Sequence, residues 1–112
     1  MPAFVFAPAD NPMYLSKVGN WVITFISDAQ TQPVRLAMTY VIPRQQDHGM
    51  QPRRIEIEQA TTPHAWDIQS LECYDAEQSK DTLLDVNSEQ ANEFFQNILL
   101  EFQKYDVEMT IE

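Results

Sequence analysis

Residues 87–105 read NSEQANEFFQNILLEFQKY and contain the most regular apolar pattern of the chain. The pair Asn87 and Gln90 resembles a capping box, so a helix is expected to begin at Asn87 or Ser88. Beyond this start, apolar residues recur at intervals of three and four positions, which is the period of one helix face. They are Ala91, Phe94, Phe95, Ile98, Leu99, Phe102 and Tyr105. Rings of this size can cover a sheet, so the stretch predicts a long amphipathic helix packed on strands.

Several segments outside this helix alternate apolar and polar residues as strands do. The run from Trp21 to Ile26 is β-branched and aromatic, and with the alternating run from Val34 to Ile42 it predicts a long hairpin. Residues 66–74 fit both a helix and a strand, and a strand with a bulge is the favoured interpretation. Shorter strands are predicted at residues 4–6, 55–58, 83–86 and 107–111.

These elements together predict an α+β fold. Its parts are an antiparallel sheet of about five to seven strands, one long C-terminal amphipathic helix packed on it, and a final strand. A chain of 112 residues fits a single compact domain, here residues 1–112, and six Phe, four Tyr and two Trp are enough for a real core.

The composition argues against several classes of protein. One cysteine, Cys73, allows no disulfide within the chain and suits a reducing compartment. Residues 1–9 lack the pattern of a secretory leader, and the longest apolar run is far shorter than the ~20 residues of a membrane span. Gly19 and Gly49 stand apart, so there is no nucleotide-binding glycine loop and no cofactor is expected. We therefore expect a small acidic cytoplasmic protein that does not contact a membrane.

The charges of the chain divide by halves. Residues 1–54 contain five Lys/Arg and three Asp/Glu, residues 55–112 contain two Lys/Arg and fourteen Asp/Glu, and the net charge is −10. A domain of this sign repels nucleic acid, because affinity for a duplex comes largely from Lys and Arg on phosphates. It attracts basic protein surfaces and speeds encounter with them. The leading hypothesis is a non-enzymatic interaction module of the inhibitor, immunity or adaptor type, which binds a basic partner through its acidic C-terminal half.

Candidate partner-binding residues come from the exposed faces of the predicted elements. Leu100 lies opposite the apolar stripe on a helical wheel, among acids and amides, where it could anchor a protein contact inside a polar rim. The partner-binding candidates are Glu56, Glu58, Glu89, Glu93, Leu100 and Glu101. Three arginines in or beside the polar loop expected at residues 43–54 are candidates for an anion contact: Arg44, Arg53 and Arg54.

Two patterns resemble chemical sites without completing one. His64, Asp67 and Cys73 are the residue types of a Cys/His nucleophile site, but a lone cysteine in an apolar segment is usually an inert core residue. The run from Asp75 to Asp81 has the alternate oxygen spacing that opens a calcium loop, yet Lys80 stands where the sharp turn needs glycine. We therefore predict no catalytic residue and no metal site.

Two other functions remain open as alternatives. A small-molecule binding domain or small enzyme would use a pocket between helix and sheet, with polar groups from the set Arg35, Tyr40, His64, Asp67 and Cys73. A homo-oligomer would pair through an exposed edge strand, for which residues 4–6 and 107–111 are the candidates.

Overall fold

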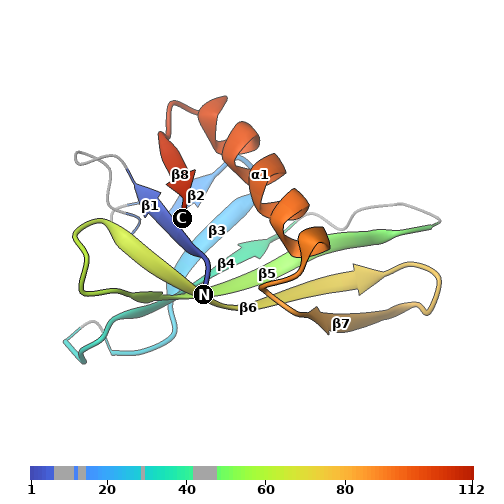
Figure 1. Ribbon diagram of the computed structural model, residues 1–112, viewed down its shortest axis with the longest axis horizontal. Helices are drawn as coiled ribbons and strands as arrows, with labels where there is room; N and C mark the ends of the chain where they lie inside the picture. Colours follow the sequence, from blue (N-terminus) through green and yellow to red (C-terminus); the bar gives the residue numbers. More distant parts are fainter. Residues whose placement is uncertain (7–11, 13–14, 29, 42–47) are drawn as a thin grey trace.

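The computed structural model describes residues 1–6, 12, 15–28, 30–41 and 48–112. It contains an antiparallel sheet with one helix packed across it, which confirms the predicted α+β class (Figure 1). The elements are, in chain order, β1 (Ala3–Phe6), β2 (Lys17–Val18), β3 (Trp21–Phe25), β4 (Arg35–Tyr40), β5 (Met50–Gln59), β6 (Ala65–Asp75), β7 (Lys80–Leu84), α1 (Glu89–Gln103) and β8 (Met109–Ile111). The predicted hairpin is β3 and β4, and the predicted final strand is β8.

Strand β1 lies inside the sheet. The strand order is β2-β3-β4-β5-β6-β1-β8, and β7 pairs with β6 outside this path. Phe4 lies opposite Trp66 of β6 on one side and opposite Ile111 of β8 on the other. The expectation that residues 4–6 form an exposed edge is therefore wrong: Phe4 and Phe6 are buried, and their strand has a partner on both sides. The other edge candidate, β8, does end the sheet order.

Strand β6 contains the bulge that its sequence suggested. Ser70 lies opposite Glu56 and Ile68 lies opposite Ile57, so Gln69 is the extra residue. The side-chain alternation changes phase at this point, which explains why the segment also fitted a helical period. The buried hydrophobic residues on the two sides of the bulge are Ala65, Trp66, Ile68, Leu71 and Cys73.

Strand β5 begins earlier than the sequence indicated. It covers Met50–Gln59, so Arg53 and Arg54 lie in a strand and not in the loop expected at residues 43–54. Pro52 made residues 50–54 resemble a loop, because proline inside a sheet is confined to edges and bulges. The structure has such an irregularity there, since the register with β6 shifts between Pro52 and Arg54.

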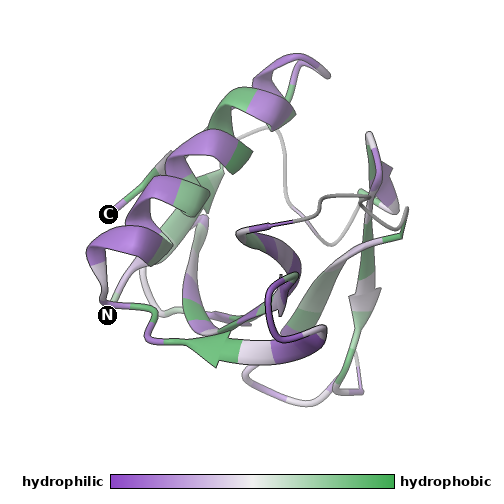
Figure 2. Ribbon diagram, turned by 90° about the vertical axis from the view of Figure 1, so that its right-hand side faces the viewer, coloured by the Kyte–Doolittle hydropathy of each residue, from purple (hydrophilic) through white to green (hydrophobic). Residues whose placement is uncertain are grey.

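Helix α1 begins at Ser88, one of the two predicted starts, but its cap joins Ser88 and Ala91 and not the predicted pair Asn87 and Gln90. Ser88 is the N-cap, and its side-chain oxygen accepts a hydrogen bond from the backbone N–H of Ala91 at 3.1 Å. Along α1, hydrophobic positions alternate with hydrophilic ones (Figure 2), and the hydrophobic positions supply the core contacts. The rings of Phe95 and Phe4 meet edge to face with centroids 5.6 Å apart. The buried helix residues are Ala91, Phe95, Ile98 and Phe102.

The helix ends at Gln103, before the apolar stripe of the sequence is complete. Tyr105 is therefore 56% exposed, and its ring lies close to Gly19 in the turn between β2 and β3. Asp106 has a positive φ of 61°, as the chain turns from α1 towards β8. No helix in the described part of the chain is long and apolar enough to cross a bilayer.

Candidate functional site

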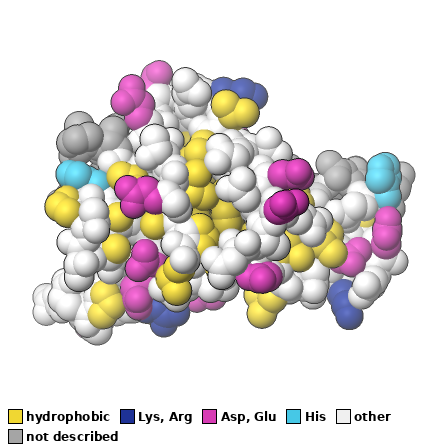
Figure 3. All heavy atoms as spheres, viewed as in Figure 1, with side chains coloured by type: hydrophobic (Ala, Val, Ile, Leu, Met, Phe, Trp, Pro, Cys, Tyr) yellow, Lys and Arg dark blue, Asp and Glu magenta, His cyan; other side chains and the backbone are white. Residues whose placement is uncertain are grey.

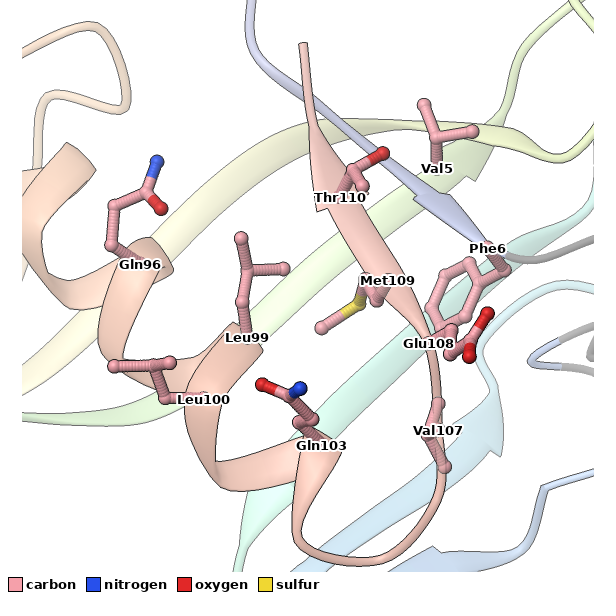
Figure 4. A pocket seen from close by; sticks show the side chains of 10 residues that line it. All are labelled: Val5, Phe6, Gln96, Leu99, Leu100, Gln103, Val107, Glu108, Met109 and Thr110. Atoms are coloured by element: carbon pink, nitrogen blue, oxygen red, sulfur yellow. The ribbon is translucent and has the colours of Figure 1, made fainter.

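A groove lies between the C-terminal half of α1 and strand β8, and we call it the α1–β8 groove (Figure 4). Its volume is about 680 Å³, within the range of clefts that hold ligands. Leu99 on α1 and Met109 on β8 extend towards each other from the two walls, and Leu100 lies further out on the helix. The groove is lined by Val5, Phe6, Gln96, Leu99, Leu100, Gln103, Val107, Glu108, Met109 and Thr110.

The path of the chain after α1 creates this groove. The helix ends at Gln103, and the chain returns as β8 beside β1, at the end of the sheet order. Because β8 has only three residues, it covers the neighbouring side chains of α1 incompletely. Leu99 is half-buried, and Leu100 is 61% exposed. The structure thus places the predicted anchor Leu100 in the wall of an apolar groove.

Acidic side chains lie in the groove and beside it. Glu108 lines it, and a neighbouring hollow of about 740 Å³ at the N-terminal end of α1 is lined in part by Glu89, Glu93 and Glu112. Among the described residues, no Lys or Arg lines either hollow. Figure 3 shows Asp and Glu side chains around hydrophobic atoms on the face that carries α1. This face therefore combines apolar surface with a negative potential.

Two predicted partner-binding residues, Glu56 and Glu58, point away from the core on β5, where they alternate with buried isoleucines. The guanidinium of Arg35 lies 3.6 Å from the carboxylate of Glu56 and 3.9 Å from that of Glu58. The side chains of Ser70 and Gln69 also donate hydrogen bonds to these two carboxylates. The structure therefore separates Glu56 and Glu58 from the acids of α1, so the acidic half of the chain forms more than one surface.

Glu101 lies beside a third hollow, of about 190 Å³, between α1 and strands β3 and β5. Its carboxylate accepts a hydrogen bond from the indole N–H of Trp21 at 3.3 Å. Gln51 lines the same hollow and is 4% exposed, and neither of its amide atoms has a hydrogen-bond partner in the described part of the chain. The sequence pattern did not mark Gln51 as a buried residue, because the nearby register shift interrupts the alternation of the strand.

The five polar residues of the alternative pocket do not meet at one site. Arg35 and Asp67 belong to the outward-facing positions of β4 and β6, whereas Cys73 is buried in the core. The ring of Tyr40 packs edge to face against the indole ring of Trp21, and the two ring centroids are 5.3 Å apart. His64 is exposed in the turn before β6, with a φ of 66°. The structure therefore places these residues at separate positions and does not bring them together at one pocket.

Cys73 has the properties of a core residue. Burial raises the pKa of its thiol from 9.0 to about 12, and the negative charge of Glu72 adds to the effect. The thiol is therefore neutral at physiological pH, whereas nucleophilic cysteines react as thiolates. This environment gives Cys73 no activation for catalysis.

The calcium-like segment after β6 forms a turn. Asp75 is buried, and its carboxylate accepts hydrogen bonds from the backbone N–H groups of Glu77 at 3.0 Å and Gln78 at 3.3 Å. This carboxylate thus closes the turn between β6 and β7. Within the described ranges, no group of His, Cys, Asp and Glu residues is arranged to hold a metal ion.

The arginine candidates for an anion contact are divided between a strand and an undescribed segment. Arg44 lies outside the described residues. Arg53 and Arg54 lie in β5, and the guanidinium of Arg54 donates a hydrogen bond to the hydroxyl of Thr39 at 3.4 Å. The structure therefore does not show these three arginines as one group.

Comparisons with known proteins return no relative of this chain. No protein-family model, no curated protein and no solved structure matches it. The function must therefore be inferred from the α1–β8 groove, its acidic surroundings and the open end of the sheet.

Proposed function

We propose that this protein is an interaction domain that binds a basic segment of a protein partner at the α1–β8 groove. One observation carries the proposal: an apolar groove with Leu100 61% exposed in its wall has Glu108, and no Lys or Arg, in its described lining. Protein interfaces commonly place an apolar anchor inside a polar rim. A basic segment with apolar side chains would complement both properties of this surface.

Two physical effects support a partner of this kind. The net charge of −10 attracts basic surfaces, which raises the association rate and makes it fall with salt. The groove then contributes affinity, because complete burial of a leucine side chain is worth about 1.5–3 kcal/mol relative to exposure. Leu100 and the half-buried Leu99 supply surface that a partner can cover. Charge would thus select the partner, and the groove would hold it.

A small-molecule binding role has one observation in its favour. The lining of the third hollow includes the aromatic residues Trp21 and Phe94 and the polar residues Glu101 and Gln51. Its volume of about 190 Å³ is smaller than the roughly 300–1,000 Å³ of typical ligand pockets, so it suits only a small ligand. Titration with small amines and amides, followed through the NMR signal of the Trp21 indole, tests this role. An indole signal that no compound shifts would exclude it.

A pull-down at two salt concentrations tests the interaction proposal. The purified chain is expected to recover a basic protein from an extract of its source cells at low salt, and less of it at high salt. The double variant Glu108→Gln/Glu112→Gln should recover less of that protein, because it removes two charges beside the groove.

A matched control changes the same number of charges elsewhere. The variant Glu77→Gln/Asp81→Asn changes one residue in the turn between β6 and β7 and one at the start of β7. Both lie at the far end of the sheet from β8 (Figure 1). This variant should recover the partner as the unmodified chain does. Equal recovery by both double variants, or recovery of no basic protein at either salt concentration, would overturn the proposal.

A further inference from the structure

Strand β8 presents backbone hydrogen-bonding groups on the side away from β1. Ala3 and Glu112 exchange both backbone hydrogen bonds, at 3.2 and 2.9 Å, which makes them a hydrogen-bonded pair of the antiparallel ladder. Backbone groups in such a ladder point to alternate sides. Thr110, opposite Val5, therefore directs its N–H and C=O towards β1, and Met109 and Ile111 direct theirs away from it. No strand of the described chain pairs with β8 on that side.

The α1–β8 groove runs along this strand. Met109 and Ile111 lie opposite Phe6 and Phe4, so their side chains are on the core face of the sheet, and Met109 lines the groove with Leu99 and Leu100. Glu108, Thr110 and Glu112 alternate with them and are exposed. A strand added to β8 would thus meet apolar side chains on one face and two carboxylates on the other. Peptide recognition by strand addition uses this combination of an open edge and side-chain pockets.

A second copy of this chain fits the edge poorly. Antiparallel pairing of two β8 strands about Thr110 would place Glu108 of each copy opposite Glu112 of the other. Like charges directly opposite each other destabilise a strand pair. Each copy would also bring a net charge of −10. The charges therefore favour a basic occupant over a copy of the same chain.

We propose that the partner binds through an extended segment that adds to β8 as a further strand, an inference that rests on the interaction function proposed above. Side chains directly across a strand pair share a face. The residue opposite Met109 would therefore be apolar and enter the groove, and the residue opposite Ile111 would be apolar and cover that side chain. The residues opposite Glu108 and Glu112 would be Lys or Arg. The recognised pattern is basic, apolar, any residue, apolar, basic.

A labelled peptide containing Lys-Val-Thr-Ile-Lys between neutral Ser-rich flanks tests this pattern by fluorescence anisotropy with the purified chain. A peptide with Val-Lys-Thr-Lys-Ile has the same composition and charge but presents the two kinds of side chain to the wrong faces. It is expected to bind at least about tenfold more weakly, which corresponds to about 1.4 kcal/mol. Equal binding of the two peptides would overturn strand addition.

Backbone methylation separates strand addition from simple charge attraction. N-methylation of the peptide Val or Ile removes an N–H that would bond to β8, and it should weaken binding by about tenfold or more. N-methylation of the central Thr should change binding much less, because in this register its N–H points away from β8. Equal effects at all three positions would overturn the register.

Two leucine variants test the groove itself. Leu100→Gln should weaken peptide binding by about tenfold, whereas Leu83→Gln should leave it unchanged. Leu83 is a matched control, because it is 69% exposed and lies in β7, away from the groove. Equal binding by the two variants would show that the groove wall does not contact the peptide.

The outcomes distinguish the two proposals. If the pull-down recovers a basic partner that depends on Glu108 and Glu112, but the peptide results show no dependence on alternation or methylation, strand addition fails and the interaction function stands. If neither the peptides nor any basic protein binds, both fail. If light scattering shows a dimer and the peptides do not bind, strand addition of a partner is wrong, and a second copy becomes the candidate occupant of the edge.

Discussion

Replacement of Gln51 by methionine is expected to raise the free energy of unfolding. Gln51 is 4% exposed, and its two amide atoms have no hydrogen-bond partner in the described part of the chain. A buried amide without partners costs about 1–3 kcal/mol in mutational data. Methionine has a similar length, carries no strongly polar group and adapts to irregular gaps. We expect a gain of about 1–2 kcal/mol, because repacking in the small hollow recovers only part of the full amount.

Urea unfolding measures this difference. The midpoint should rise for Gln51→Met with an unchanged slope, since the surface exposed on unfolding stays nearly the same. Far-UV circular dichroism should accompany tryptophan fluorescence as a probe, because Trp21 lines the same hollow. Gln51→Ala is the control: it also removes the amide but leaves a cavity, which should cancel much of the gain.

A loss of about 1 kcal/mol or more in Gln51→Met would refute the reasoning, since it would mean that the amide is hydrogen-bonded in the native state. The same variant also bears on the small-molecule role of the hollow. If a small ligand uses the Gln51 amide, the variant should lose that ligand while it gains stability. Such a result would show that Gln51 lowers the stability of the fold but contributes to ligand binding.

Three further changes have expected outcomes. Gly19→Ala should lower the free energy of unfolding by about 1–2 kcal/mol, because φ is +58° and the added Cβ would lie 2.9 Å from Cε2 of Tyr105. Urea unfolding of Gly19→Ala with and without Tyr105→Ala separates the cost of the positive φ from the cost of the clash with the tyrosine ring. Tyr105→Ala should recover only the stability lost to the clash. Ser88→Ala should cost about 1 kcal/mol by loss of the N-cap bond to Ala91, and Asn87→Ala, which changes no N-cap side chain, is the comparison. The raised pKa of Cys73 means that the folded state holds its thiol proton more tightly than the unfolded state, so the contribution of this group to stability should be constant below pH 9.0 and fall as pH rises from 9.0 towards about 12. The slope due to this group is at most about 1.4 kcal/mol per pH unit, and Cys73→Ala should lack that contribution in urea titrations across this pH range.

Local patterns were sufficient for the helix and most strands. The stripe that predicted α1 depends only on spacing within the helix, and the cap at Ser88 depends on residues next to it. The hairpin of β3 and β4 is likewise formed by neighbouring segments. The pattern of β6 was ambiguous between helix and strand because a bulge at Gln69 shifts the alternation of its side chains.

Patterns of this kind could not place β1 or the start of β5. Phe4 pairs with Trp66 and Ile111, which are distant in the chain, and nothing in residues 4–6 distinguishes an inner strand from an edge strand. At β5, Pro52 is a sound local signal for a loop or an edge, but pairing of β5 with β6 accommodates it beside a bulge. In both places, contacts between distant segments outweighed local preference.

The candidate site divides in the same way. Composition established the acidic charge, and the helical period identified Leu100 as an exposed apolar residue, because both are properties of the chain itself. The groove required the return of β8 beside β1 after the turn that follows α1. The sheet likewise assigned Glu56 and Glu58 to a surface with Arg35, away from the helix acids. Charge and periodicity are carried by the residues, but a surface exists only after distant segments have packed together.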